Sequence, residues 1–500
     1  MNAALPGDAA LLAGAALLVV GVLLSGFADR FRAPGLLLFL GLGMLLGDDG
    51  LAFIRFSDAE AAQRIGVVAL VVILFEGGLS TSVTDVRRVA APAALLATVG
   101  VVVTALVVAG GVLLITDTSP TTALLIGAVV ASTDAAAVFA VLRRAPTPRR
   151  LNSLLETESG GNDPMAVLLT VGVLASWSGD PDVTEWALFG ARQLGGGLVV
   201  GLAVGAAGSF AVQRLRLDSA ALYPVLALGL AGLAYGAGAG VGASGFLAVY
   251  VTGLVLGSTA PRQRRSIRRF HEGLASVSQI ALFLLLGLLV FPAQLPAVAI
   301  TGLATAGVLI FLARPLAVLT CLPWFGFDRR ELTFSAWAGL RGAVPIVLAT
   351  FPLIAGYPDG DLVFNVVFFV VLVSAALQGL TVGPLARALG LEAGTTAWDA
   401  VADLVSIDSA GVDVVELEIT SSCGVAGRTL REVPLPGTAR VAAVLRDDGV
   451  RVPDGNTRLA PGDLLIVVTA SDAGGPALLT AWAEGPRADP LAPPPDGGQA

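Results

Sequence analysis

Long apolar runs constrain this 500-residue chain more than any other feature. A helix needs about 20 consecutive apolar residues to cross the hydrocarbon core of a bilayer. Within that core the backbone must satisfy its own hydrogen bonds, which favours helices. Charged residues make up only 14% of the chain, compared with about 25% in soluble domains. The sequence therefore predicts an all-α polytopic membrane protein.

About thirteen transmembrane helices are expected. Of the 23 arginines in residues 1–390, 18 fall in alternate loops on one side of this arrangement and three on the other. Arginine-rich loops are typically cytoplasmic, so we expect the N-terminus outside and the C-terminal segment in the cytoplasm of a cell (inner) membrane. The expected spans are residues 8–27, 34–48, 63–80, 90–115, 119–142, 154–178, 185–212, 220–237, 243–258, 273–291, 295–320, 331–356 and 361–386.

Polar breaks interrupt three of these runs, at 131–134, 158–164 and 339–345. A carboxylate in mid-membrane costs about 2.5–3.5 kcal/mol even on lenient scales, so such groups usually serve a function. At 1.5 Å per helical residue, Asp134, Asp163 and Arg341 all lie roughly 12–15 Å from the cytoplasmic side. Broken helices at corresponding positions of two halves predict inverted repeats, with an ion site where the two helices cross.

The oxygen atoms near this depth suit a dehydrated monovalent cation. Ser159 and Asp163 are spaced i,i+4 and share one helix face. We expect a cation/proton-binding set of Asp163, Ser159, Thr133, Asp134 and Asn162, in which Asp163, Ser159 and Thr133 are the metal-ion ligands. Asp134 either joins them or only caps a half-helix.

The neighbouring residues are expected to balance charge at the site. Glu158 and Asn162 share another face, and we expect Glu158 to pair with Arg341, since an unpaired buried charge is costly. Asp163 can carry either a proton or a cation, which yields obligatory exchange when the site faces each side in turn. Because Asn162 does not titrate, one-for-one, electroneutral exchange is expected.

These motifs resemble those of the monovalent cation:proton antiporter-1 family. Thr133-Asp134 matches its fifth-span pair, Glu158-Ser-Gly-Gly-Asn-Asp-Pro164 its sixth-span motif, and Gly339–Pro345 its arginine motif. Gly160-Gly161 replace the leucines of the common sodium/proton pattern, and the resulting form is similar to the potassium/proton branch. The resemblance implies a homodimer with a static interface domain beside a moving ion-carrying core.

The C-terminal segment predicts a small α/β domain. Residues 412–420 alternate like an exposed-edge strand, 440–446 and 464–470 read as further strands, and 476–482 as a helix. Three motifs within the segment resemble those of a TrkA-C (RCK-C) regulatory domain: Gly427–Glu432, Val441–Gly449 and Leu459–Leu465. We expect a linker at 391–409, the domain at 410–484 and disorder at 485–500. A small-molecule or nucleotide regulator of this domain is a hypothesis.

Several other classes are disfavoured. The sequence shows no nucleophile–base pair, metal cluster or phosphate loop, so we expect neither an enzyme nor a cofactor, and no nucleic-acid partner. A ligand-gated potassium channel subunit lacks its carbonyl-rich filter loop. A sodium/proton antiporter of the same fold remains the nearest alternative. Arg314 is expected to brace the fold, and His271 to lie solvated in a basic loop.

Overall fold

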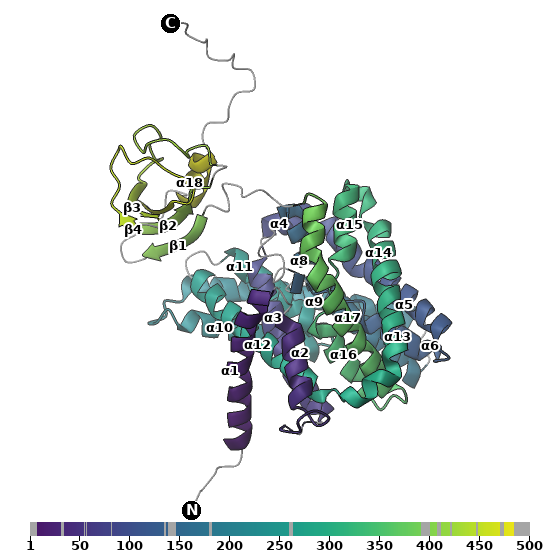
Figure 1. Ribbon diagram of the computed structural model, residues 1–500. Coiled ribbons are helices and arrows are strands. Elements are labelled where there is room, and N and C mark those ends of the chain that lie inside the picture. The colour runs from purple at the N-terminus through teal and green to yellow at the C-terminus, as the bar shows by residue number, and fades with distance from the viewer. Residues whose placement is uncertain are drawn as a thin grey trace, which may run out of the picture. The chain divides into compact units, whose positions relative to one another are not determined.

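The computed structural model divides into two compact units, Met1–Glu392 and Ala393–Ala500. The first is helical, and the second is a five-stranded sheet with one helix (Figure 1). This confirms a helical membrane protein with a small C-terminal α/β domain. The structure describes residues 8–31, 35–54, 56, 58–81, 83–134, 137–138, 147–179, 183–259, 264–391, 401–407, 412–420, 423–446, 449–470 and 475–484.

Seven helices of the described residues are long and apolar enough to cross a membrane. Several spans contain a π-helical or 3-10 turn (η) between α-helical segments. The helices of the first half are α1 (Asp8–Phe31), α2 (Gly35–Leu46), α3 (Ala59–Ser80), α4 (Val83–Leu95), η1 (Leu96–Gly100), α5 (Val101–Ile115), α6 (Pro120–Val129), α8 (Arg149–Ser178) and α9 (Val183–Arg214). Those of the second half are α10 (Leu222–Gly240), α11 (Gly245–Thr259), α12 (Arg264–Leu289), η2 (Pro292–Gln294), α13 (Leu295–Val308), η3 (Leu309–Ala313), α14 (Arg314–Cys321), η4 (Pro323–Phe325), α15 (Arg329–Trp337), α16 (Ala343–Ile354) and α17 (Gly360–Ala388).

Two of the three expected breaks are real interruptions of a helix. Helix α6 ends at Val129 and residues 132–134 have no regular secondary structure, while residues 338–342 separate α15 from α16. The third break is absent, because α8 continues through Gly160, Gly161 and Pro164. Pro164 lies in the middle of α8, where a proline removes one backbone donor, and the surrounding helical bonds still hold the segment.

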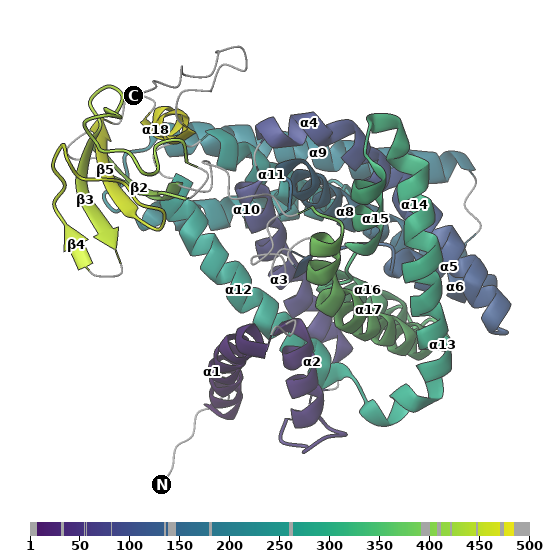
Figure 2. The ribbon, with the colours of Figure 1, turned by 45° about the horizontal axis from the view of Figure 1, so that its top comes forward.

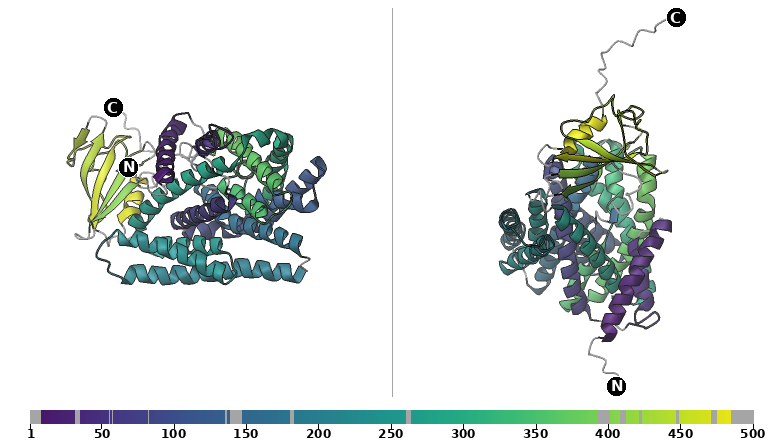
Figure 3. Two further views of the ribbon diagram at one scale, coloured as in Figure 1. Left: turned by 90° about the horizontal axis from the view of Figure 1, so that it is seen from below. Right: turned by 90° about the vertical axis from the view of Figure 1, so that its left-hand side faces the viewer.

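Glycines set the closest helix contacts in the membrane unit. Gly253 and Gly257 of α11 face the backbone of Phe75 and Leu79 in α3, and Gly78 of α3 faces the carbonyl of Tyr250. A Cβ at any of these three glycines would overlap backbone atoms of the other helix. Small residues allow this backbone-to-backbone approach in lipid. On its other side α11 packs against α9, which lies beside α10 (Figure 3).

His271 does not lie in a solvated loop, as the sequence suggested. Helix α12 (Figure 2) begins at Arg264, earlier than expected, and its residue range includes the histidine. The side chain is fully buried, Nδ1 lies 2.7 Å from the Ile267 carbonyl oxygen, and the ring packs edge-on against Phe75 at 5.0 Å. The arginines from Arg264 onward therefore belong to the first part of a helix, one face of which is buried through Ile267 and His271.

The C-terminal unit is an antiparallel sheet in the order β1-β2-β5-β3-β4. Its core includes Val415, Leu417, Leu465 and Val467, with Leu479 contributed by the helix. Its elements are β1 (Val401–Ile407), β2 (Val412–Glu418), β3 (Arg440–Arg446), β4 (Gly449–Arg451), β5 (Leu464–Ala470) and α18 (Gly475–Glu484).

Two expectations for this unit were wrong. Strand β2 is not an edge strand, because β1 and β5 pair with it on either side. Strand β1 falls inside the expected linker 391–409, since backbone pairing with β2 extends the sheet by one strand. The expected disordered segment, 485–500, lies outside the described residues.

Candidate cation site

The two helix breaks cross each other at the centre of the membrane unit. The Asp134 amide donates to the carbonyl oxygen of Leu340 at 2.8 Å, which joins the break after α6 to the break before α16. The Asp134 carboxylate lies against Gly342, where any Cβ would overlap it. A glycine is therefore required at 342 to bring the carboxylate to the start of α16, the positive end of that helix dipole.

Arg341 has the opposite role at the end of α6. Its Nη1 donates to the carbonyl oxygens of Ala131 at 3.0 Å and Ser132 at 2.6 Å. Cations stabilise helix C-termini because the last carbonyls lack helical partners. Arg341 is 1% exposed, so it compensates the negative end of α6 inside the protein.

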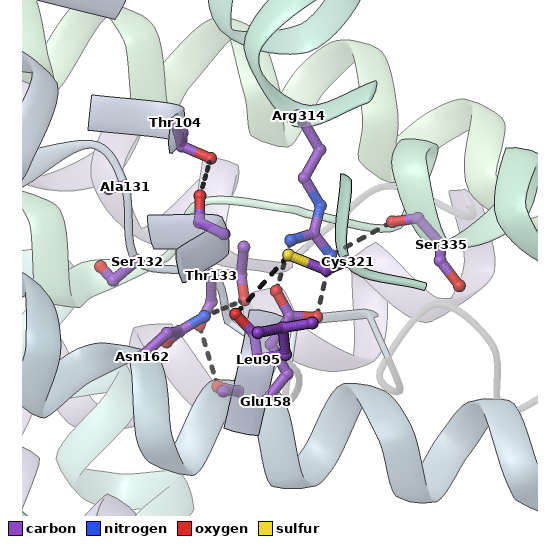
Figure 4. Close-up of polar contacts among 12 residues, drawn as sticks. Leu95, Thr104, Ala131, Ser132, Thr133, Glu158, Asn162, Arg314, Cys321 and Ser335 are labelled. Carbon is purple, nitrogen blue, oxygen red and sulfur yellow. Dashed lines mark hydrogen bonds and ion pairs between the residues drawn. The ribbon is translucent and has the colours of Figure 1, made fainter. Parts of the chain in front are cut away.

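Helix α8 joins the crossing through Thr133 (Figure 4). Ser159 Oγ donates to the Thr133 carbonyl oxygen at 2.9 Å, and Asn162 Nδ2 donates to Thr133 Oγ1 at 2.5 Å. Ser159 and Asn162 thus contact the break together. The sequence spacing grouped Asn162 with Glu158 on one face of α8 and Ser159 with Asp163 on another. In the structure, Asn162 and Ser159 both bind Thr133.

Asp163 lies one residue beyond this junction and is 5% exposed. Its neighbouring polar groups include Asp134, Ser132 and Arg341. Three buried oxygens at this place have no hydrogen-bond partner among the described residues: Oδ1 of Asp163, Oδ1 of Asn162 and Oγ of Ser132. A buried polar atom left unpaired costs about 1–3 kcal/mol. A bound cation or proton would satisfy such oxygens.

Glu158 pairs with Arg314 of α14 and not with Arg341, which corrects the expected ion pair. Both guanidinium nitrogens Nη1 and Nη2 bind the carboxylate, the second at 2.9 Å from Oε2. Arg314 also donates to the Ser335 carbonyl oxygen at 3.2 Å. Both side chains are at most 4% exposed, and Arg341 is already used at the end of α6.

One residue of the site, Ser132, was missed by reading the sequence. Arg314 was expected to brace the fold, and the structure gives it Glu158 as the partner that a charge within an apolar run needs. Ser132 carried no comparable signal. Its unpaired hydroxyl becomes notable only because the break after α6 places it beside Asp163.

Two side chains of the site, Asp163 and Asn162, are buried in this structure. Two hollows of about 470 and 490 Å³ lie elsewhere, one between α14 and α15 and one in the C-terminal domain, and neither is lined by the residues described above.

The fold and the crossing define a secondary transporter of the broken-helix class. Residues 15–388 match the sodium/hydrogen exchanger transmembrane family, and residues 414–474 match the TrkA-C domain. The chain belongs to the sodium/hydrogen exchanger family, within the monovalent cation:proton antiporter-1 group, and carries a TrkA-C domain.

Relatives and solved structures agree with this assignment. The K(+)/H(+) antiporter NhaP2 of Shewanella baltica is 39% identical over 462 residues, covering 91% of this chain and 80% of the relative. The K(+)/H(+) antiporter NhaP of Alkalimonas amylolytica is 40% identical over 441 residues, covering 86% and 76%. The sodium proton antiporter MjNhaP1 from Methanocaldococcus jannaschii superposes with a TM-score of 0.68 at 26% identity, covering 76% of this chain and 98% of that structure.

Proposed function

We propose that this chain exchanges K⁺ for H⁺ across the cell membrane by alternating access. The observation that carries the proposal is the group of unpaired, buried oxygens around Asp163. Hard oxygen ligands suit an alkali cation, and a carboxylate can instead take a proton. The K(+)/H(+) relatives support potassium.

Each candidate residue has a distinct role in this proposal. Asp163 binds the cation or the proton, and the oxygens of Ser159 and Thr133 complete the cation's coordination. Asn162 holds Thr133 in place through its amide. Asp134 and Arg341 compensate the two half-helix dipoles beside the site. Glu158 braces α8 through Arg314, in place of the Arg341 pairing expected from the sequence.

The membrane arrangement proposed here has thirteen spans in two inverted repeats, with the N-terminus outside. The arginine distribution supports this orientation. We propose a homodimer, by resemblance to the family. The TrkA-C domain, matched at residues 414–474, would then lie in the cytoplasm, as a regulatory module for a small molecule or nucleotide.

The test compares purified protein in vesicles that report internal pH. We expect K⁺ to dissipate an imposed pH gradient faster than Na⁺, Rb⁺ or Li⁺, and the rate to be insensitive to an imposed membrane potential. A faster response to Na⁺ would favour the sodium/proton alternative, and a steep voltage dependence would refute one-for-one exchange.

The decisive variant is Asp163→Asn, which keeps the size of the side chain and removes its titration. We expect exchange to fall by about 100-fold or more, because the group that carries both ions is lost. The matched control is Asp117→Asn, at an exposed carboxylate outside the site. Cation-dependent proton flux at the native rate in Asp163→Asn would contradict the proposal.

A further inference from the structure

Gly160 lies three residues before Asp163 in α8. An aromatic ring from another helix fills the space that a side chain at position 160 would occupy. A Cβ at Gly160 would overlap the Cε and Cζ atoms of the Tyr250 ring. The adjacent Gly161 differs, because its Cβ would meet only the Ala97 methyl, at 3.0 Å. The gap in α8 at Gly160 is therefore filled specifically by Tyr250.

Tyr250 projects from helices that cannot shift easily against each other. Its helix, α11, is packed backbone to backbone on α3 through Gly78 and Gly253. On the side of α9, Thr252 Oγ1 donates to the Gly201 carbonyl oxygen at 3.1 Å, and a Cβ at Gly201 would overlap the backbone of α11. The tyrosine ring, 7% exposed, is thus anchored in a rigid unit of α3, α9 and α11.

Helix α8 is held to different partners. Its polar bonds run to the crossing at Thr133 and to the α14–α15 region, through Glu158–Arg314 and through Arg150, whose Nη2 donates to the Phe325 carbonyl oxygen at 2.6 Å. Towards α11, in contrast, the ring of Tyr250 rests directly on the backbone of α8 at Gly160. The contact at position 160 itself is steric, because ring carbons of Tyr250 make it.

Exchange requires the Asp163 site to face the two sides of the membrane in turn, so α8 and its polar partners must move relative to the rigid unit. The contact between Tyr250 and Gly160 lies on that boundary, one helical turn from the ion-binding carboxylate. We propose that Tyr250 is a positioning residue for exchange. Its ring packs on Gly160 and thereby fixes the position of α8 against α11. A residue with a side chain at position 160 would displace the ring, so glycine is needed there. This inference rests on the proposed antiport function.

The experiment is a double-mutant cycle on full-length protein in vesicles, with Gly160→Ala, Tyr250→Ala and the combined variant. We expect Gly160→Ala to lower the maximal exchange rate by about tenfold or more, since a displacement of about 1 Å at a reacting centre can cost more than that. The K⁺ concentration for half-maximal rate should change by less than about twofold, because the cation ligands remain. Tyr250→Ala alone should slow exchange by only about threefold, because α8 loses the ring but no cation ligand. Adding it to Gly160→Ala should bring the rate back to about that of Tyr250→Ala alone, a strong coupling.

Three controls separate positioning from general loosening. Gly195→Ala, in α9 with no atom near the added methyl, should exchange at the native rate. Tyr250→Phe keeps the ring carbons that meet position 160 and should therefore retain more exchange than Tyr250→Ala. Gly253→Ala should not be rescued by Tyr250→Ala, because its methyl would meet the backbone of Phe75.

Each outcome bears on one claim. If native protein exchanges cations for protons and Gly160→Ala does so equally fast, or if the combined variant is as slow as Gly160→Ala, the role of Tyr250 is refuted and antiport stands. Absence of exchange in native protein with every cation would refute the proposed function itself. Should Gly160→Ala fail to reach the membrane, the combined variant must restore both its abundance and its rate, and restored abundance without exchange would overturn the positioning role.

Discussion

Helices α8 and α11 adjoin the same region of the membrane unit but are held in opposite ways. Helix α11 is held mainly by close packing, since its glycines bring its backbone into contact with that of α3. Helix α8 is held by hydrogen bonds and an ion pair from Ser159, Asn162 and Glu158 to specific polar partners. Backbone contacts tolerate almost no displacement, whereas a polar cluster can travel as one body. Under the proposed function, α11 belongs to the static part and α8 to the part that carries the ion.

The largest effect that would test this comparison is expected at the buried ion pair of α8. Arg314→Gln should destabilise the protein by about 3–5 kcal/mol, because Glu158 is left charged and unpaired in the interior. The measurement is the midpoint of thermal unfolding in detergent. Adding Glu158→Gln should recover much of the loss.

The same experiment decides between two pairings of Glu158. The matched comparison is Arg341→Gln, whose defect should not be relieved by Glu158→Gln, because Arg341 binds the carbonyls of Ala131 and Ser132. Relief of Arg341→Gln, and not of Arg314→Gln, would restore the pairing expected from the sequence.

A smaller effect is expected in the static part. Gly253→Ala should lower stability by about 1–3 kcal/mol, the usual cost of overpacking, because the methyl group meets the carbonyl of Phe75. Gly232→Ala in α10 is the control, since no atom lies within 4 Å of the added methyl. Equal unfolding midpoints for the two variants would argue against a rigid α3–α11 pair.

The smallest effect is expected at an ion pair on the surface. Arg64 Nη2 lies 2.8 Å from Glu60, but the two side chains are 77% and 61% exposed. Arg64→Gln should therefore change the unfolding free energy by at most about 0.5 kcal/mol. A loss comparable to that of Arg314→Gln would show that burial does not distinguish the two pairs.

Much of the site could be predicted because membrane burial makes polar residues conspicuous. Asp134, Asp163 and Arg341 stood out as charges within apolar runs, and the structure brings them together. The same reasoning could not predict which arginine pairs with Glu158. Depth along each helix placed Arg341 near Glu158, but depth does not specify which helices are neighbours.

The remaining errors have a similar cause. Gly160, Gly161 and Pro164 suggested a broken helix by local propensity, yet α8 is continuous within its tertiary surroundings. His271 was placed in a loop because arginines surround it, although the buried face of α12 encloses it. Strand β1 was taken as part of a linker, since its pairing with β2 is a non-local contact.

The sequence by itself determined the helical membrane class, the α/β character of the C-terminal domain and the residues that carry charge at mid-depth. The length of an apolar run and the cost of burying a charge within it are local properties, so each can be judged from one segment of the sequence. Only the tertiary structure decided that Glu158 binds Arg314, that the two breaks cross through Asp134 and Leu340, and that Tyr250 occupies the space at Gly160. These are contacts between distant segments, fixed by how whole helices pack.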